Sequence, residues 1–422
     1  MKRLIQFTTV ILFLGGLVFS ARASFSSIYV FGDTISATTT NNVIGTSGTN
    51  YFYGTRYSNG RDWVEVLAQR QGLGANSITN ANWAYSSNNL SFYGQYSPLL
   101  VTNINKFVAP ANATNCLFIV WVDNADFVGD MTSFGSPPAV NNQAAWTAAI
   151  NQHLTNHFNA ITKLYAKGCR TLIAPNAVDV TTVPQFNNSS ASWRTFVRQQ
   201  IVNFNTSYAA MLNQIQSSPS YPGLKIYAPD IFSLLNNVLT NAASYGLTNA
   251  LSGGFSIDVM ETPSLSPWAL NGPGTNYIFW DPNGDPTAKM QAIVADTVQQ
   301  MISPVQINGL TQINGSNRLD VVNMPVGLNG FLDGSTNLAQ AGNWTLVTNF
   351  NSTGTAQSIF VVTPPLPANF GAGGSGGSGG LSGPPVPGQG GSGSTTSTNT
   401  DLGVNFAAQF YRLRFPYAWN WP

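Results

Sequence analysis

Residues 26–36 read SSIYVFGDTIS, and this stretch decides the fold. Ser27–Phe31 is a short uncharged run of aromatic and β-branched residues, as expected for a strand that is buried on both faces. Gly32 and Asp33 are turn residues that end the strand. The hydroxyl of Thr34 therefore stands at a strand-to-turn junction, which is a place where proteins present a nucleophile.

Similar short apolar runs recur through the first 300 residues, where they alternate with segments of helical periodicity. The expected strands are 27–31, 116–122, 170–174 and 225–227, and the expected helices are 62–71, 143–167, 192–216 and 287–302. This alternation predicts an α/β fold, a three-layer α/β/α sandwich around a mainly parallel sheet. Ligands of such sheets bind beyond the carboxyl ends of the strands.

A small β-rich domain is expected at 304–422, after a main domain at 24–303. Its β-like runs are 318–322, 344–350 and 357–362, with Asn, Gly and Ser turns between them. Residues 364–400 form a Gly/Ser/Pro tract that cannot bury a core, so we expect a disordered loop or linker there. The run AAQFYRLRF at 407–415 alternates like one more strand, so the tract should interrupt this domain. We assign the domain to attachment, sorting or glycan contact.

The first 23 residues have the features of a secretory signal peptide. Lys2 and Arg3 precede the apolar run 4–19, and Ala21-Arg22-Ala23 is a small-x-small cleavage site. The run is interrupted by polar residues and is too short to span a bilayer. We expect cleavage near Ala23, and a protein that is secreted or held at the cell surface without a transmembrane anchor.

The charge balance excludes a nucleic-acid partner. The chain has 17 Lys and Arg against 16 Asp and Glu, and removal of Lys2, Arg3 and Arg22 leaves 14 against 16, a balance of −2. No basic surface is expected from these numbers. Only 8% of the residues are charged, so uncharged polar side chains should form most of the surface.

The two cysteines, Cys116 and Cys169, each stand just before an expected strand. An oxidising compartment would allow a disulfide between them, and two buried thiols are an equal alternative. No CxxC motif or Cys/His set indicates zinc. We expect no metal and no cofactor.

Several stretches together identify a family. Gly32–Ser36 resembles the first block of the GDSL (SGNH) esterase family, which reads Gly-Asp-Ser-Leu. Further stretches resemble later blocks of that family in the same order, at 53–61 (YGTRYSNGR), 82–87 (NWAYSS), 121–127 (WVDNADF) and 279–287 (FWDPNGDPT). The resemblance spans about residues 26–302. It implies an SGNH, flavodoxin-like sandwich and ester hydrolysis by a serine, a histidine and oxyanion-binding donors.

The residues at the catalytic positions differ from those of the family. Thr34 stands in place of the serine, and Asp285 stands in place of the histidine, with one extra residue between it and Asp281. A carboxylate is a weaker base than imidazole near neutral pH. The only histidines, His153 and His157, lie four residues apart on a helix. We expect both to be at the surface or partly buried, and a metal-binding pair is less favoured because no carboxylate adjoins them.

The residues at the oxyanion-binding positions also differ from those of the family. Ala125 replaces the family's asparagine, and Ser86 or Ser87 replaces a glycine whose backbone N–H would donate. Asn124 could supply the missing amide only if the loop shifts by one residue, and Asp126 follows at the cleft. Loss of one such donor costs about 2.7 to 4 kcal/mol of transition-state stabilisation.

These departures favour a secreted, GDSL-type protein that keeps a ligand cleft and has lost most or all serine-type esterase activity. The alternative is an active carboxylester hydrolase in which Thr34 is the nucleophile and Asp281 and Asp285 share a proton, which would raise one pKa enough to make a base.

Two further hypotheses concern binding. The cleft could hold a glycan or an ester between the aromatic walls Trp83, Tyr85, Trp121 and Trp280. The aspartates at the strand ends could bind calcium or magnesium. Caps are the more common role of such residues, with Asp33 and Asp126 capping turns and Asp281 capping a helix.

Overall fold

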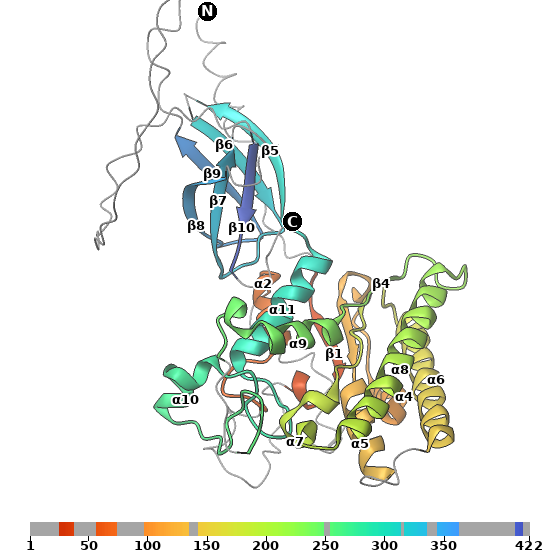
Figure 1. The fold of residues 1–422 in the computed structure, drawn as a ribbon. Coiled ribbons are helices and arrows are strands. Elements are labelled where there is room, and N and C mark those ends of the chain that lie inside the picture. Colours follow the sequence, from red (N-terminus) through yellow and green to blue (C-terminus); the bar gives the residue numbers. More distant parts are fainter. Residues whose placement is uncertain are drawn as a thin grey trace, which may run out of the picture.

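A computed structural model of the chain describes residues 25–37, 56–73, 97–134, 142–248, 254–313, 316–335, 344–362 and 410–416. The expected signal peptide, the block 82–87 with Trp83, Tyr85, Ser86 and Ser87, and the Gly/Ser/Pro tract lie outside these residues. Figure 1 shows an α/β body and a separate β region.

The α/β body is built on a four-stranded parallel sheet in the order β1-β2-β3-β4. The strands are β1 (Ile28–Gly32), β2 (Leu117–Trp121), β3 (Thr171–Ile173) and β4 (Lys225–Tyr227). Every residue of β2 is buried, as a strand covered on both faces requires. The parallel sheet predicted from the alternating pattern is confirmed.

Helices cover both faces of the sheet (Figure 1). One side carries α2 (Trp63–Arg70), α9 (Ile231–Thr240) and α11 (Ala288–Ile302), and the other carries α4 (Ser97–Lys106), α6 (Gln143–Ala166) and α8 (Ala191–Ser217). Three shorter helices, α5 (Asp123–Ser133), α7 (Pro184–Asn187) and α10 (Pro267–Asn271), lie in the connections. The three-layer arrangement is therefore the expected one.

Side-chain caps set where the long helices begin. Asn142 accepts a hydrogen bond from the backbone of Ala145 at the start of α6, and Ser190 does the same for α8. Thr287 caps α11 by accepting from the Met290 N–H. The expectation that Asp281 caps this helix is therefore wrong, because that residue lies before the cap.

The β region consists of two antiparallel three-stranded sheets, in the orders β10-β7-β8 and β5-β6-β9. The strands are β5 (Gln306–Ile313), β6 (Ser316–Val322), β7 (Asn329–Ser335), β8 (Thr345–Asn351), β9 (Ala356–Val362) and β10 (Phe410–Arg414). Leu319, Leu332 and Leu413 belong to its small core. The sequence did not predict β5 or β7.

The β region contacts the α/β body at the end of α2. The backbone N–H of Val326 donates to the carbonyl of Arg70, and the Arg70 side chain donates to the carbonyl of Val326. Arg70 also pairs with Asp296 of α11 at 2.7 Å, and both side chains are buried. One arginine therefore links α2, α11 and the β region.

Both cysteines are buried free thiols. Cys116 Sγ lies 3.3 Å from the Ser26 hydroxyl, and Cys169 Sγ contacts the carbonyl of Thr171. Burial raises the pKa of the Cys169 thiol. Of the two alternatives, the structure has the buried thiols and not the disulfide.

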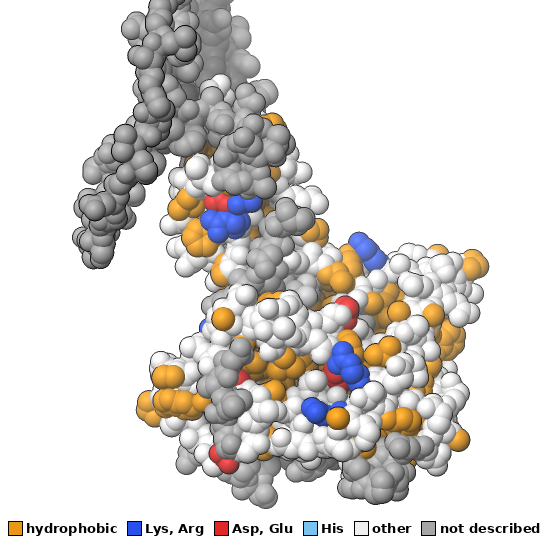
Figure 2. Space-filling view, in the orientation of Figure 1, with side chains coloured by type: hydrophobic (Ala, Val, Ile, Leu, Met, Phe, Trp, Pro, Cys, Tyr) orange, Lys and Arg blue, Asp and Glu red, His pale blue; other side chains and the backbone are white. Residues whose placement is uncertain are grey.

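Charged side chains are sparse on the face of the molecule in Figure 2, where uncharged polar atoms and apolar side chains predominate. Within the described residues, no helix has the length and apolar character needed to cross a bilayer.

Removal of the Asp296 carboxylate should destabilise the protein strongly. Asp296→Ala leaves the guanidinium of Arg70 buried without its counter-charge, and we expect the free energy of unfolding to fall by about 3 to 5 kcal/mol. Urea unfolding followed by circular dichroism measures this loss. The double variant Arg70→Met, Asp296→Leu should recover most of it, and a double variant as unstable as the single one would contradict the explanation.

Candidate functional site

A cavity of about 340 Å³ lies at the carboxyl ends of β1 and β2, where the fold predicts a ligand site. Its wall is mostly apolar and includes Tyr57 and the four valines Val128, Val178, Val180 and Val183. Its polar groups come from four separate segments. They are Asp33, Thr34, Asn124, Gln185, Asn283 and Asp285.

The end of β1 places Thr34 in this cavity. Thr34 begins a single 3-10 turn, η1 (Thr34–Ser36), and Asp33 caps this turn by accepting from the Ile35 N–H at 3.1 Å. The expected capping role of Asp33 is confirmed. A Cβ on Gly32 would come within 2.8 Å of Ser36 and 3.3 Å of the Trp121 carbonyl, so the tight turn requires glycine.

Thr34 and Asp285 are in contact, although 251 positions separate them in the chain. The Thr34 hydroxyl donates to Asp285 Oδ1 at 3.4 Å. The backbone N–H of Asp285 in turn donates to Asp281 Oδ1 at 3.2 Å. The structure thus brings together the three residues that the sequence singled out as nucleophile and base, with Asp281 behind Asp285.

The carboxyl groups of this site are protonated more easily than usual. Burial raises the pKa of Asp285 well above its ordinary value, and the neighbouring Asp281 and Asp33 raise it further, whereas the bond from Thr34 lowers it. Burial likewise raises the pKa of Asp33 to about 7, against lowering by the Ile35 N–H. Asp285 becomes a base only as the pH rises.

Asn124 lines the cavity and carries a side-chain amide. Its Oδ1 accepts from the Val178 N–H at 2.9 Å, which fixes the side chain. Its Nδ2 is buried and has no hydrogen-bond partner among the described residues. Ala125 also lines the cavity but has no side-chain donor. Asn124 therefore has the free N–H group that an oxyanion site needs, one position before the family's asparagine.

Asp126 is not part of the cavity wall. It was expected at the cleft, yet it is buried and its Oδ1 accepts from the Ser97 N–H at 2.8 Å, at the first residue of α4. Of the two roles expected for Asp126, a cleft residue or a cap, its bond to the first residue of α4 agrees with a cap.

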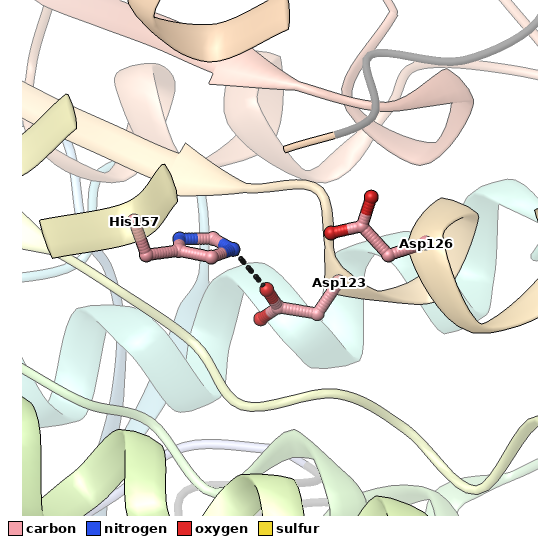
Figure 3. Close-up of side chains that lie close together, drawn as sticks. All are labelled: Asp123, Asp126 and His157. Atoms are coloured by element: carbon pink, nitrogen blue, oxygen red, sulfur yellow. Dashed lines mark ion pairs between the residues drawn. The ribbon is translucent and has the colours of Figure 1, made fainter. Parts of the chain in front are cut away.

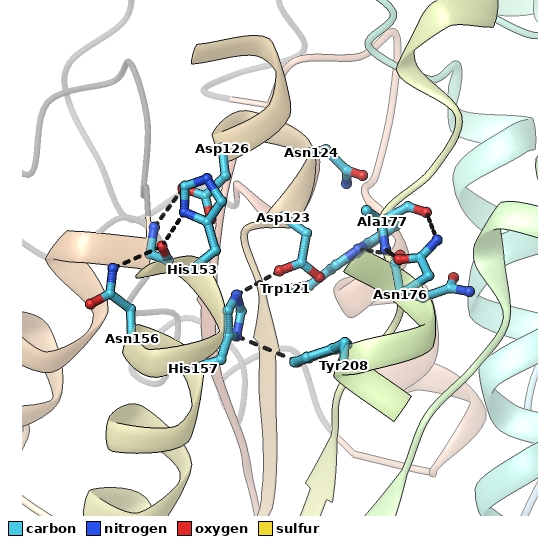
Figure 4. A network of polar contacts seen from close by, with 12 residues as sticks. Trp121, Asp123, Asn124, Asp126, His153, Asn156, His157, Asn176, Ala177 and Tyr208 are labelled. Atoms are coloured by element: carbon cyan, nitrogen blue, oxygen red, sulfur yellow. Dashed lines mark hydrogen bonds and ion pairs between the residues drawn. The ribbon is translucent and has the colours of Figure 1, made fainter. Parts of the chain in front are cut away.

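The expected position of the histidines is wrong, because both are buried in ion pairs. His157 Nε2 lies 2.5 Å from Asp123 Oδ1 (Figure 4). His153 Nε2 lies 2.8 Å from Asp130 Oδ2. The carboxylates belong to α5 and the imidazoles to α6. The sequence missed these pairs because the packing of two helices, and not proximity in the chain, brings the groups together.

Trp121 and Trp280 are not aromatic walls of the site. Both are buried in the core, and the Trp121 indole donates to the Asn176 carbonyl at 3.1 Å. It also packs edge-to-face on Trp63 of α2.

No family model matches the chain, but two curated proteins are similar to it. A GDSL esterase/lipase of Arabidopsis thaliana is 24% identical over 339 residues, which cover 68% of this chain and 86% of that protein. A second GDSL esterase/lipase of the same plant is 25% identical over 211 residues, 46% of this chain and 56% of that protein. Both similarities support membership of the GDSL esterase/lipase family. Four of the blocks that resemble the GDSL pattern, at 32–36, 53–61, 121–127 and 279–287, contribute to the wall of this cavity.

The buried Asp33 carboxyl should make the protein less stable as the pH rises. Its pKa of about 7 lies above its ordinary 3.8, so the folded chain binds more protons than the unfolded chain between these values. The free energy of unfolding should therefore fall from about pH 4 to 7, by up to about 1.4 kcal/mol per pH unit. In Asp33→Asn this contribution is absent, and the decline should be shallower.

Urea unfolding at pH 5, 6, 7 and 8 measures the difference. Asp230→Asn is the control, because hydrogen bonds from Ser233 and Asn176 lower the pKa of Asp230 in spite of its partial burial. Its carboxyl is ionised in the folded and the unfolded chain throughout this pH range, so the curve of Asp230→Asn should run parallel to that of the wild type. Parallel curves for Asp33→Asn and the wild type would exclude the assignment.

Proposed function

We propose that the chain binds a small carboxylic ester in the cavity and has lost the serine-histidine hydrolysis of its family. We also propose that it acts after export, with the signal peptide removed near Ala23. The observation that carries this proposal is the contact between Thr34 and Asp285, in which a carboxyl takes the place of the family's imidazole.

The lining of the cavity supports ester binding. Aliphatic side chains suit the acyl or alkyl part of an ester. Both apolar surfaces are removed from water on binding, and neither loses a hydrogen bond. The buried Nδ2 of Asn124 suits the carbonyl oxygen, since a donor without a partner gains a full hydrogen bond from the ligand. A glycan site with aromatic platforms is less well supported, because Trp121 and Trp280 lie in the core.

The loss of serine-histidine chemistry is supported by where the histidines are. The chain has two histidines, and both are buried in pairs with carboxylates of α5. Neither lines the cavity or contacts Thr34. The hydroxyl of Thr34 therefore has only a carboxyl as its base, and its additional methyl group crowds the attacking oxygen.

The 3.4 Å contact also favours a second candidate function, slow ester hydrolysis by Thr34. The Asp285 carboxylate would take the hydroxyl proton while the oxygen attacks the ester carbonyl, and would return it to the departing alcohol. A water molecule would then attack the acyl-Thr34 ester with the same carboxylate as base, which releases the acid and restores the hydroxyl. Asn124 Nδ2 would donate to the oxyanion. Because the pKa of Asp285 is raised, this activity would increase with pH through the neutral range.

Hydrolysis assays separate the two candidates. We expect the mature protein from Ser24 to hydrolyse p-nitrophenyl acetate and butyrate no faster than Thr34→Ala. A restored variant, Thr34→Ser with Ala125→Asn and Asp285→His, should gain measurable activity, because it regains an imidazole base and the family's amide. A wild-type rate that exceeds the Thr34→Ala rate and rises with pH would instead establish Thr34 as a nucleophile.

Ester binding should depend on the amide of Asn124. We expect Asn124→Ala to weaken the binding of a non-cleaved analogue, such as phenyl butyl ketone, by about 2- to 10-fold in calorimetry, as befits one hydrogen bond. Asn205→Ala is the matched control, because Asn205 bonds the neighbouring backbone at Ala177 and does not line the cavity. Equal losses in both variants would point to a general loosening of the 177–178 segment.

A further inference from the structure

Three buried side chains converge behind the cavity wall, as Figure 3 shows. Asp123 and Asp126 come from the first turn of α5, and His157 comes from α6. One ligand atom of each lies within 4.8 Å of the others. All three residues are at least 98% buried, and none of them lines the ester cavity.

The unused atoms of these side chains point toward one another, because bonds to their other atoms hold them in place. Asp126 Oδ1 is held by the Ser97 N–H, and His157 Nδ1 lies 3.4 Å from the Tyr208 hydroxyl (Figure 4). A second bond of this kind is how metal-ligating side chains are oriented in proteins. It leaves Asp126 Oδ2 and His157 Nε2 facing the carboxylate of Asp123.

The carboxylate oxygens in this space have no hydrogen-bond donor among the described residues. Both oxygens of Asp123 and the Oδ2 of Asp126 are buried without such a bond, apart from ion-pair contacts with the imidazoles at 2.5 Å and 3.5 Å. A buried carboxylate oxygen without a donor is costly. These oxygens point to a bound cation.

Carboxylates also outnumber the cationic groups around this space. Asp33 acts electrostatically on both Asp123 and Asp126, and its own Oδ2 lacks a donor. Asp130 contacts the imidazole of the second histidine, His153. Three carboxyl groups therefore contact the two imidazoles, and Asp33 is a fourth carboxyl close to them. A divalent ion would balance the excess charge without uptake of protons.

We propose that Asp123, Asp126 and His157 bind one zinc ion. Zinc accepts imidazole nitrogen and carboxylate oxygen at about 2.0 to 2.2 Å in a four-coordinate site, and the second oxygen of Asp123 provides the fourth ligand. Calcium needs six to eight oxygen ligands, and magnesium an octahedron of oxygens, so both fit a site with an imidazole less well. Zinc binds neutral imidazole and ionised carboxylate, so its affinity falls as the pH is lowered.

The ion would hold the β2–α5 junction and the α6 helix together. Asp123 immediately precedes Asn124 and Ala125, which line the ester cavity. The site does not depend on the proposed ester function, because none of its ligands contacts the cavity. Sequence reasoning weighed the histidines and the strand-end aspartates only as separate metal ligands, since only the fold brings the two helices together.

The test uses the full mature chain, stripped with a chelator and then given zinc, both as folded protein and during refolding from urea because the site is buried. We expect one zinc per chain by elemental analysis. The melting temperature should rise by about 5 °C or more at zinc concentrations a hundredfold above the Kd. Calcium at the same concentration should give no rise. Cobalt in place of zinc should give the visible absorption bands of a four-coordinate site.

Variants assign the ligands. Asp123→Asn and His157→Gln should each lower the bound zinc below about 0.2 per chain. Asp258→Asn should keep one zinc, because Asp258 is an equally buried carboxyl without donors that no histidine faces.

Three results would overturn the proposal. They are a wild-type protein that retains no zinc and shows no change in melting temperature, ligand variants that keep one zinc, and an Asp258→Asn variant that loses it. The wild-type stoichiometry and the cobalt spectrum decide the matter even if a ligand variant fails to fold.

Discussion

The parallel pairing of β1 with β2 is the constraint on which the rest of the site depends. Gly32 lies opposite Trp121, and the Asp33 N–H continues the ladder by donating to the Trp121 carbonyl at 3.1 Å. The two strands therefore end at the same level, so the turn after β1 and the helix after β2 begin side by side. Thr34 and Asn124 face one cavity for this reason, with no direct bond between them.

The sequence predicted those parts of the structure that follow from local pattern. The bounds of β4 were correct to the residue, and the ends of α6, α8 and α11 were correct to within one residue, because caps and apolar periodicity mark them. The β5 strand was missed because nearly all of its residues are exposed, so it has no alternating pattern of burial to detect.

The candidate site was predictable only as far as its residues belong to recognisable blocks. Thr34, Asp281 and Asp285 were found in this way. The role of Asn124 was not fixed, because it depends on the Val178 N–H, which holds the amide in place from a different loop. The pairing of His157 with Asp123 likewise arises from the contact of α5 with α6, and the sequence of neither helix alone predicts it.

Exchange of an imidazole for a carboxyl changes the electrostatics of the whole cavity. A histidine can carry positive charge, whereas Asp33, Asp281 and Asp285 can carry only negative charge or none. Burial raises the pKa values of Asp285 and Asp33, and neighbouring carboxyls raise them further, so additional negative charge in this place is disfavoured. An anionic ligand such as a free carboxylate would be repelled, so the cavity suits a neutral ester better than its acid product.

The β region is closed by a strand that is remote in sequence. β10 pairs along five residues with β7, and both Arg412 and Arg414 form ion pairs with the buried Asp333. Leu413 packs in the core of the region. These contacts hold the last strand in place independently of the peptide chain between Val362 and Phe410. A protease cut in that interval would thus leave two fragments that still migrate as one particle, and separate only under denaturing conditions.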